Sequence, residues 1–175
     1  MKRDDISVKL LRKLLRLDPV AGRLVWRARH KSMFPNTGVG SEVYCKRWNT
    51  RFGGKPAFLS VDNTGYNKAF IFAQKYYAHR VVWALTHGQW PHGQVDHING
   101  DRSDNRPENL RDVTQQQNMW NAKKRSGTKS KFKGVCMAGK SWTSAIYVGG
   151  KKTYLGCFPC ETAAAVAYDL ASRMH

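Results

Sequence analysis

Apolar residues recur at a helical spacing near the start of the chain and then lose their regularity. Over residues 6–17 they follow i, i+4 spacing, while lysines and arginines occupy the opposite side, which predicts an amphipathic helix. A turn containing Pro and Gly should lead into a short strand over 24–26. Residues 28–54 show no period and carry scattered basic residues among Gly and Asn. This segment is therefore predicted to be a long basic loop.

The next segment has the pattern of a small sheet followed by a helix. Residues 55–61 and 66–72 are predicted to be strands, and the Asp-Asn-Thr-Gly sequence at 62–65 supplies the turn between them. Residues 76–79 are expected to pair back onto the second strand. A helical pattern over 80–87 then ends before a segment rich in Gly and Pro.

The stretch 94–121 combines short apolar segments with a high density of Asp, His and Asn. Residues 95–98 predict a strand, in which alternate side chains face opposite ways, so that Asp96 and His97 point to opposite faces. The loop over 99–109 is rich in Gly, Asp, Asn and Pro, which favour turns.

A second strand and a helix are predicted to follow this loop. Residues 110–113 are apolar at both ends and can return beside the first strand. Thr114, with Gln117 three residues later, is a capping-box pattern, so a helix should begin there. Asn118 then lies just past the first helical turn. The predicted order is strand, loop, strand, helix.

This arrangement has a chemical use if its side chains converge. A carboxylate from Asp96 and an amide oxygen from Asn118 are ligands that hard divalent cations prefer. The imidazole of His97 can accept a proton from water near neutral pH. Together the three side chains predict a one-metal site that hydrolyses phosphodiesters.

Each of these residues also has an interpretation without chemistry. An Asp-His pair beside a polar loop can be solvated surface, and Asn105 and Asn109 can be turn residues that bond their own backbone. Asn121 is interpreted as a solvated helix residue. His79 is assigned to packing or hydrogen bonding and not to metal ligation.

The same stretch resembles the HNH (ββα-metal) nuclease motif of phage and intron-encoded homing endonucleases. The resemblance rests on V-D-H-I-N-G-D-R-x-D-N-R-x-E-N-L-R, with Asp96-His97 at the end of the first strand and Asn109 twelve residues after the histidine. It implies that Asp96 and Asn118 hold one Mg²⁺ or Mn²⁺, that His97 is the general base, and that Asn109 clamps the loop. It also implies products with 5′-phosphate and 3′-hydroxyl ends.

The composition shifts sharply after residue 121. Residues 123–130 belong to a run of Lys, Arg, Gly and Ser that cannot form a core, so they are predicted to be a linker that follows a phosphate backbone. The basic side chains of this run and its immediate continuation are Lys123, Lys124, Arg125, Lys129, Lys131 and Lys133.

From residue 131 a second unit is predicted. Short strands are expected over 133–136, 142–147 and 152–155, followed by an Ala-rich helix over 161–174. In the middle strand alternation places Trp142, Ser144 and Ile146 on one face. The three strands are expected to form a small sheet, with its inner face packed on the helix and its outer face uncovered.

This unit resembles the AP2 DNA-binding domain, through K-F-K-G-V, W-T-S-A-I, Y-L-G-C-F and E-T-A-A-A-V-A-Y-D. The resemblance implies that the sheet enters the major groove of DNA. It places Lys133, Tyr147, Lys152 and Tyr154 at contact sites. Cys136 stands where plant members carry an arginine, so their sequence preference is not transferred.

The charge balance narrows the class of partner. The chain has 175 residues, 30 Lys and Arg against 12 Asp and Glu, and a formal net charge of +18. An enzyme for a small neutral substrate has no need of such a charge, whereas a polyanion partner does. A membrane surface is not favoured as the partner, because the sequence contains no long apolar run and no basic amphipathic helix ending in aromatics. No signal peptide is visible, so a cytoplasmic, non-secreted protein is expected.

The spacing of the four cysteines bears on whether the protein binds structural zinc. Cys157 and Cys160 have half of a zinc-ribbon spacing, but Cys45 and Cys136 stand alone, so reduced thiols are expected and structural zinc is not.

These observations predict an α+β protein in which an HNH module and an AP2-like domain cooperate on double-stranded DNA, with no protein partner implied. The predicted parts are an N-terminal helix, strand and loop over 1–54, the nuclease domain over 55–122, the linker over 123–130, and the AP2-like domain over 131–175. The predicted function is a metal-dependent HNH homing-type DNA endonuclease. The alternatives are a non-catalytic AP2-type DNA-binding protein with a relic nuclease module and, more weakly supported, a structural RNA binder.

Overall fold

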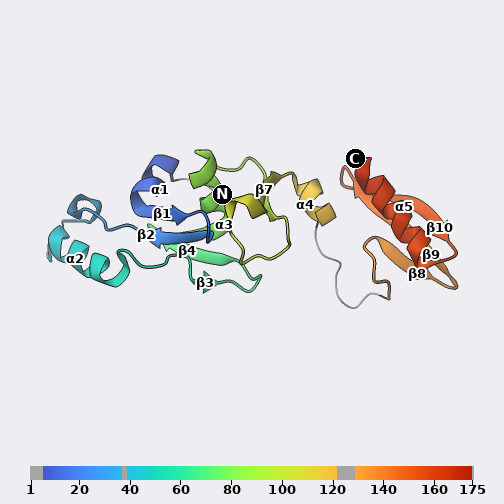
Figure 1. The fold of residues 1–175 in the computed structure, drawn as a ribbon, viewed down its shortest axis with the longest axis horizontal. Helices are drawn as coiled ribbons and strands as arrows, with labels where there is room; N and C mark the ends of the chain where they lie inside the picture. The colour runs from blue at the N-terminus through green and yellow to red at the C-terminus, as the bar shows by residue number, and fades with distance from the viewer. Residues whose placement is uncertain (1–5, 37–38, 122–128, 175) are drawn as a thin grey trace. The chain divides into compact units, whose positions relative to one another are not determined.

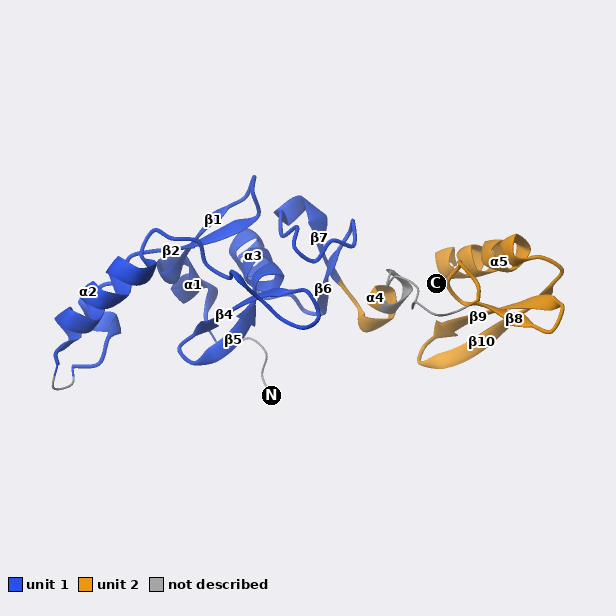
Figure 2. Cartoon of the chain, turned by 90° about the horizontal axis from the view of Figure 1, so that it is seen from below, with its two compact units in different colours: residues 1–112 blue, residues 113–175 orange. Residues whose placement is uncertain are grey.

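The chain divides into two compact units, residues 1–112 and 113–175, in the computed structural model (Figures 1 and 2). The structure describes residues 6–36, 39–121 and 129–174, and the side chains of 119–121 are outside that description. The boundary predicted at residue 54 lies inside the first unit.

The first unit begins with a helix that leads directly into a strand. Helix α1 spans Val8–Leu14 and is capped by the Ser7 side chain, which accepts from the Leu10 N–H at 3.2 Å. Strand β1, Leu15–Asp18, then pairs antiparallel with β2, Arg23–Trp26. The helix predicted to reach residue 17 is therefore three residues too long. Strand alternation buries Leu15 and half-buries Leu17, and pairing with β2 supplies the backbone partners that another helical turn would have given.

The prediction of a loop over residues 28–54 is wrong for much of this segment. It contains the short 3₁₀ helix η1, Lys31–Met33, and the twelve-residue helix α2, Ser41–Phe52. The missed signal is an aromatic stripe at i, i+4 and i+8, formed by Tyr44, Trp48 and Phe52. Most other residues of α2 are charged or polar, and none of its residues is fully buried.

A three-stranded antiparallel sheet in the order β3-β4-β5 follows, with β3 at Ser60–Val61, β4 at Asn67–Ile71 and β5 at Gln74–Tyr77. The predicted turn before β4 is confirmed, because Asp62 Oδ1 accepts from the N–H groups of Thr64 and Tyr66. Strand β3 is shorter than expected. The left-handed backbone of Phe58, with φ of 59°, interrupts the extended segment before it.

Helix α3, Ala78–His87, lies against this sheet and forms the centre of the first unit with α1. Val81 and Val82 of α3 and Leu11 and Leu14 of α1 are completely buried. The apolar side of α3 therefore faces the core that it shares with α1.

The strand-loop-strand pattern predicted near the middle of the chain is confirmed. Strand β6, Gln94–His97, forms a two-stranded sheet with β7, Leu110–Val113, and the 3₁₀ helix η2, Pro107–Asn109, lies in the loop between them. Helix α4, Gln115–Asn121, follows and belongs to the second unit.

The capping box at the start of α4 is confirmed in both directions. The Gln117 side-chain oxygen accepts from the Thr114 N–H at 2.9 Å, and the Thr114 hydroxyl accepts from the Gln117 N–H at 3.2 Å. The sequence pattern thus identified the helix start correctly.

The rest of the second unit is a three-stranded antiparallel sheet packed on one helix. Its strands are β8, Val135–Ala138, β9, Ser141–Val148, and β10, Lys151–Phe158, in the order β10-β9-β8, and its helix is α5, Glu161–Arg173. Ser144 and Ile146 are buried and Trp142 is half-buried, so the predicted inner face is confirmed. Within this architecture the AP2 resemblance stays a prediction.

Candidate active site

Strand β6 carries two of the predicted site residues on opposite faces. Val95 and His97 are buried, and Asp96 between them is half-buried, as alternation predicts. Asp96 faces Arg111 of β7, and its Oδ2 accepts from Arg111 Nε at 3.0 Å and Nη2 at 2.8 Å. A guanidinium therefore holds this carboxylate by two charge-assisted hydrogen bonds.

The protonation of the His97 ring follows from its partner. His97 Nε2 lies 3.1 Å from Asn105 Oδ1, and the Asn105 side-chain nitrogen donates to the Ser103 carbonyl. Because the Ser103 contact orients the amide, its oxygen faces the histidine and accepts a hydrogen bond. Nε2 therefore carries the proton, which leaves the lone pair of a neutral imidazole on Nδ1. This atom is the candidate proton acceptor.

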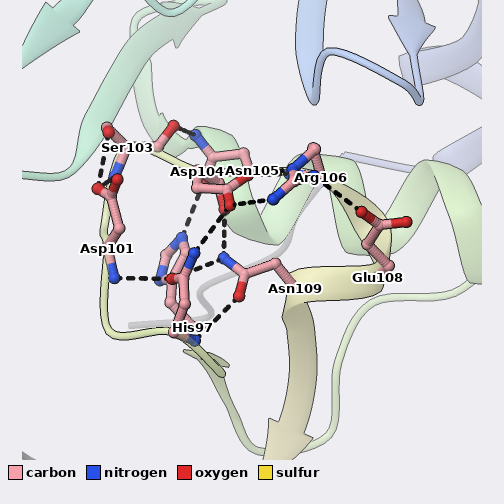
Figure 3. A network of polar contacts seen from close by, with 9 residues as sticks. His97, Asp101, Ser103, Asp104, Asn105, Arg106, Glu108 and Asn109 are labelled. Atoms are coloured by element: carbon pink, nitrogen blue, oxygen red, sulfur yellow. Dashed lines mark hydrogen bonds and ion pairs between the residues drawn. The ribbon is translucent and has the colours of Figure 1, made fainter.

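Asn109 clamps the loop that carries Asn105. Its Oδ1 accepts from the Asn99 N–H at 3.0 Å, while its Nδ2 donates to Asn99 Oδ1 at 3.0 Å and to the Asp104 carbonyl at 2.8 Å (Figure 3). Its own carbonyl accepts from the Ile98 N–H at 2.9 Å. One buried amide thus joins the start, middle and end of the loop.

The carboxylates of the loop are engaged in local bonds. The Ser103 hydroxyl and N–H bond to Asp101 and lower the pKa of that carboxyl, the hydroxyl having the larger effect. Arg106 bonds to Asp104 and holds the pKa of Asp104 well below its usual range. Arg106 also pairs with Glu108 at 3.0 Å (Figure 3). These contacts make the loop a hydrogen-bonded scaffold for the histidine.

A cluster of aromatic rings packs against His97. The His79 ring lies 5.4 Å from the His97 ring, centroid to centroid, and Tyr66 contacts both rings. Burial, with smaller contributions from His97 and Arg80, lowers the pKa of His79 to about 3. His79 Nδ1 is buried without a hydrogen-bond partner among the described residues. His79 therefore packs as a neutral ring, which agrees with its predicted packing role, but its contact with His97 was not predicted.

The turn between β1 and β2, which is distant in the sequence, packs closely against the loop between β6 and β7. Gly22 has φ of 62°, and a Cβ added there would lie 2.4 Å from the Arg106 nitrogen and 2.5 Å from the Asn105 carbonyl carbon. Only a glycine fits this approach. No pattern in the sequence links residue 22 to the loop, because the contact depends on the packing of segments far apart in the chain.

Asn118 is half-buried near the start of α4, where its N–H donates to the Thr114 carbonyl at 3.0 Å. It belongs to the second unit, and Asp96 belongs to the first. An ion shared by these two residues stays a prediction. Their oxygen donors fit a hard cation, and such an ion would share the Asp96 carboxylate with Arg111.

The predicted DNA-contact residues of the second unit gather on one face of its sheet. Lys152 pairs with Tyr147 across the strands, and Tyr154 follows two residues later, so the three side chains share a face. Tyr147 is 49% exposed and Tyr154 is 62% exposed. The face opposite them carries buried Ile146, so the outer face is as predicted.

The remaining predicted contact residues divide into two groups. Lys129 and Lys131 are exposed, and Lys133 is half-buried, where burial lowers the pKa of its ammonium group. Lys123, Lys124 and Arg125 lie outside the described residues.

Three further features of the described ranges bear on metal binding and on membrane association. No group of three or more His, Cys, Asp or Glu side chains there is arranged to hold a metal ion. Cys136, Cys157 and Cys160 are exposed free thiols, and Cys45 is a half-buried one. No helix in the described part of the chain has the length and apolar character needed to cross a membrane.

The candidate site lies within a segment that is similar to a known protein family. Residues 76–120 match the family model described as HNH endonuclease, and this range contains Asp96, His97, Asn109 and Asn118. A solved structure described as "DNA binding and cleavage by the HNH homing endonuclease I-HmuI" is similar, with 22% identity and a TM-score of 0.41. That similarity covers 66% of this chain and 55% of the other, little more than half its length. No curated protein matches the chain.

Proposed function

We propose that the protein is a metal-dependent DNA endonuclease of the HNH homing type. The observation that carries this proposal is the contact between His97 Nε2 and Asn105 Oδ1, which leaves Nδ1 as the ring nitrogen that can accept a proton. The pair lies within the segment that matches the HNH endonuclease model, and Asp96 precedes His97 in the sequence.

His97 acts as the general base in this proposal. Its Nδ1 takes a proton from a water molecule, and the resulting hydroxide attacks the phosphorus of the scissile phosphodiester in line with the 3′ oxygen. The bond from phosphorus to the 3′ oxygen breaks, and this oxygen leaves with the electron pair and takes a proton from solvent. Asn105 accepts from Nε2 throughout, so it fixes the ring orientation and stabilises the imidazolium that forms.

Asp96 and Asn118 are the proposed ligands of one Mg²⁺ or Mn²⁺. When bound, such an ion supplies positive charge to the phosphate oxygens as negative charge builds up on them. Two oxygen donors leave the other positions of a hard cation to water and to phosphate, which is the usual arrangement for Mg²⁺ at phosphate-transfer sites. Arg111 bonds to Asp96 Oδ2 and fixes the carboxylate in one orientation.

Double-stranded DNA is the proposed substrate, and the second unit is proposed to position it. Tyr147, Lys152 and Tyr154 share an outer sheet face, as the AP2 resemblance requires for contact sites. The formal net charge of +18 favours a polyanion over a neutral substrate. The proposed products end in 5′-phosphate and 3′-hydroxyl groups.

The competing function is a DNA-binding protein whose nuclease module is a relic. The geometry of the loop argues against it, since Asn109 and Asn105 are both buried and both engaged in bonds that orient the segment around His97. A nuclease module without catalytic activity would not require His97 to be held in one tautomer.

Cleavage of supercoiled plasmid carrying the surrounding genomic sequence separates the two functions. The wild-type chain with Mg²⁺ should nick or linearise the plasmid, and EDTA should prevent it. His97→Gln should lower the rate by about a hundredfold to ten-thousandfold, the usual contribution of a general base. His92→Gln, at an exposed histidine, serves as the matched control and should keep the wild-type rate. Equal rates for wild type and His97→Gln, or no Mg²⁺-dependent cleavage, would contradict the proposal.

A further inference from the structure

A groove on the first unit is lined by aromatic and basic side chains and lies outside the candidate active site. Its volume is about 740 Å³, within the range of about 300 to 1,000 Å³ that is typical of small-ligand sites. Strands β2 and β4, helix α2 and the segment 55–60 contribute its walls. None of the residues assigned to phosphodiester hydrolysis lines it.

The floor of the groove is a packed aromatic cluster. The Trp48 ring lies 5.8 Å from Trp26 in an edge-on arrangement and 5.3 Å from Phe52, and Trp26 stacks on Phe58 at 6.2 Å. Arg29 extends over the Trp48 ring, with its guanidinium carbon 3.9 Å from the ring centroid. The Trp26 and Phe58 rings are buried beneath the groove, and the Arg29 guanidinium covers one face of Trp48. The ring surfaces open to a ligand are therefore those of Phe70 and Phe72 at the rim of the groove.

Large apolar side chains stand exposed at the rim. Leu59 is 72% exposed, Phe70 64% and Phe72 55%. Exposed residues of this size grouped at one concave site mark a binding surface more often than single exposed residues do.

The backbone is strained at two of the lining residues. The described non-glycine residues with positive φ are Phe58, Phe72 and Ala73, and the first two line the groove. Phe72 and Ala73 form the two-residue turn between β4 and β5, where Asn and Gly are the usual occupants. An aromatic ring held in such a turn, at an energetic cost, is typical of a functional constraint.

The positively charged side chains that line the groove favour an anionic ligand. Arg29, Arg51, Lys55 and Lys68 line it, and none of its described lining residues is acidic. Arg29 Nε is buried without a hydrogen-bond partner in the described chain. A ligand that satisfies both features has a flat apolar face and an anionic group close to it. A nucleotide of a DNA strand has this chemistry.

We propose that this groove binds an unpaired nucleotide of a DNA strand, with its base against the aromatic side chains and its phosphates near the basic ones. A base inside a stacked duplex cannot present its face to the groove, so the nucleotide has to be single-stranded or displaced from the helix. The inference rests on the proposed DNA binding of the chain but not on hydrolysis.

The test compares binding of the full chain to two single-stranded oligonucleotides of equal length, one intact and one with abasic sites in place of its bases. Both carry the same phosphates, so a purely electrostatic surface binds them equally. With EDTA present to prevent cleavage, fluorescence anisotropy should show at least about fivefold tighter binding of the intact strand, the effect of about one stacked base.

Variants assign the preference to this groove. Phe72→Leu should reduce the preference for the intact strand toward unity, whereas Phe72→Tyr, which keeps the ring, should retain it. Arg51→Gln should weaken binding to both oligonucleotides equally, because it removes a charge and no stacking surface. Circular dichroism verifies that each variant is folded.

Equal affinity of the wild-type chain for the intact and abasic strands would overturn the proposal, as would an unchanged preference in Phe72→Leu. Plasmid cleavage by the same preparations is a separate measurement. A chain that prefers intact strands but does not cleave contradicts the nuclease function and keeps the base site, and the converse result keeps the nuclease function alone.

Discussion

His97 Nε2 donates a hydrogen bond to Asn105 Oδ1 across 3.1 Å, and the two residues are only 4% and 5% exposed. They stand eight positions apart in the sequence. A buried polar pair of this kind is stable only while both partners are present, because either group alone loses its water without compensation. The candidate base is thus coupled to the structure of the loop.

Asn105→Ala should reduce both cleavage and stability. The substitution leaves a buried Nε2–H without its acceptor, so the free energy of unfolding should fall by about 1 to 3 kcal/mol in a denaturant titration. Plasmid cleavage should slow by about tenfold or more, since the ring loses its fixed tautomer. Asn63→Ala, at an exposed turn residue, should change neither value. A fully active Asn105→Ala variant would show that the pair is not needed for catalysis.

Asn109→Asp should loosen the loop while keeping the size of the side chain. The new carboxylate cannot donate, so it faces the Asn99 amide oxygen and the Asp104 carbonyl at distances of 3.0 and 2.8 Å, where the native amide donates. We expect a loss of about 1 to 3 kcal/mol in unfolding free energy and faster amide exchange at residues 98 and 99, which bond to Asn109 in the native chain. Native exchange rates in the variant would contradict the clamp.

Gly22→Ala should destabilise the protein through the loop it contacts. Its added methyl group would lie 2.4 Å from the Arg106 nitrogen, and neither segment can move without disturbing Asn105. We expect a loss of more than about 2 kcal/mol, larger than the cost of about 1 to 2 kcal/mol for left-handed backbone alone. Thermal denaturation measures the difference.

The matched control is Gly54→Ala. Gly54 also has positive φ, at 74°, but a methyl group added there meets nothing within 4 Å. It should show the backbone cost alone. If the two variants lose the same stability, the contact between the β1–β2 turn and the loop makes no contribution of its own.

Acid should weaken the fold through His79. Its pKa is lowered to about 3 in the folded chain, whereas an unfolded histidine titrates near pH 6.5. The stability it supports is fully present above pH 6.5 and is lost as pH falls toward 3, because the unfolded chain takes up a proton that the folded chain refuses. The expected slope approaches about 1.4 kcal/mol per pH unit between pH 6 and pH 4.5.

Urea titrations across that range measure this slope. Above about pH 5 the carboxylates are ionised in both the folded and the unfolded chain, so the slope between pH 6 and pH 5 isolates histidine. His79→Leu should flatten the curve, and His92→Gln at an exposed site should leave it unchanged. A curve that stays steep in His79→Leu would assign the effect to another group.

DNA binding should depend strongly on salt. If about six phosphates are neutralised, affinity for duplex should fall by about a thousandfold between 50 and 200 mM salt. Lys152→Gln, on the outer face of the second sheet, should lower the salt slope by about one unit, whereas Lys140→Gln in the β8–β9 turn should leave it unchanged. Equal slopes for both variants would exclude this face from the interface.

Some parts of the structure follow from short-range patterns. The capping box of Thr114 and Gln117 marks the start of α4, and the Asp62 turn separates β3 from β4. The alternation of β6 places His97 inward and Asp96 outward. These features depend on interactions between residues at most four positions apart, so the sequence alone was sufficient to predict them.

Other parts depend on partners that the sequence does not bring together. Helix α1 ends at Leu14 because β2 offers strand partners to the residues that follow, and that competition is decided between segments and not within one. Helix α2 was missed because its aromatic stripe stands among charges and is only half-buried.

For the candidate site, the sequence by itself identified the residues proposed to carry the chemistry: an acid, an imidazole and two amides at a recognisable spacing. Only the tertiary structure decided how they are held. It selected Asn105 as the partner of His97, set His79 and Tyr66 against the same ring, and placed Gly22 under the loop. The physical reason is that residue spacing specifies donors and acceptors, whereas burial and long-range packing determine which of them meet.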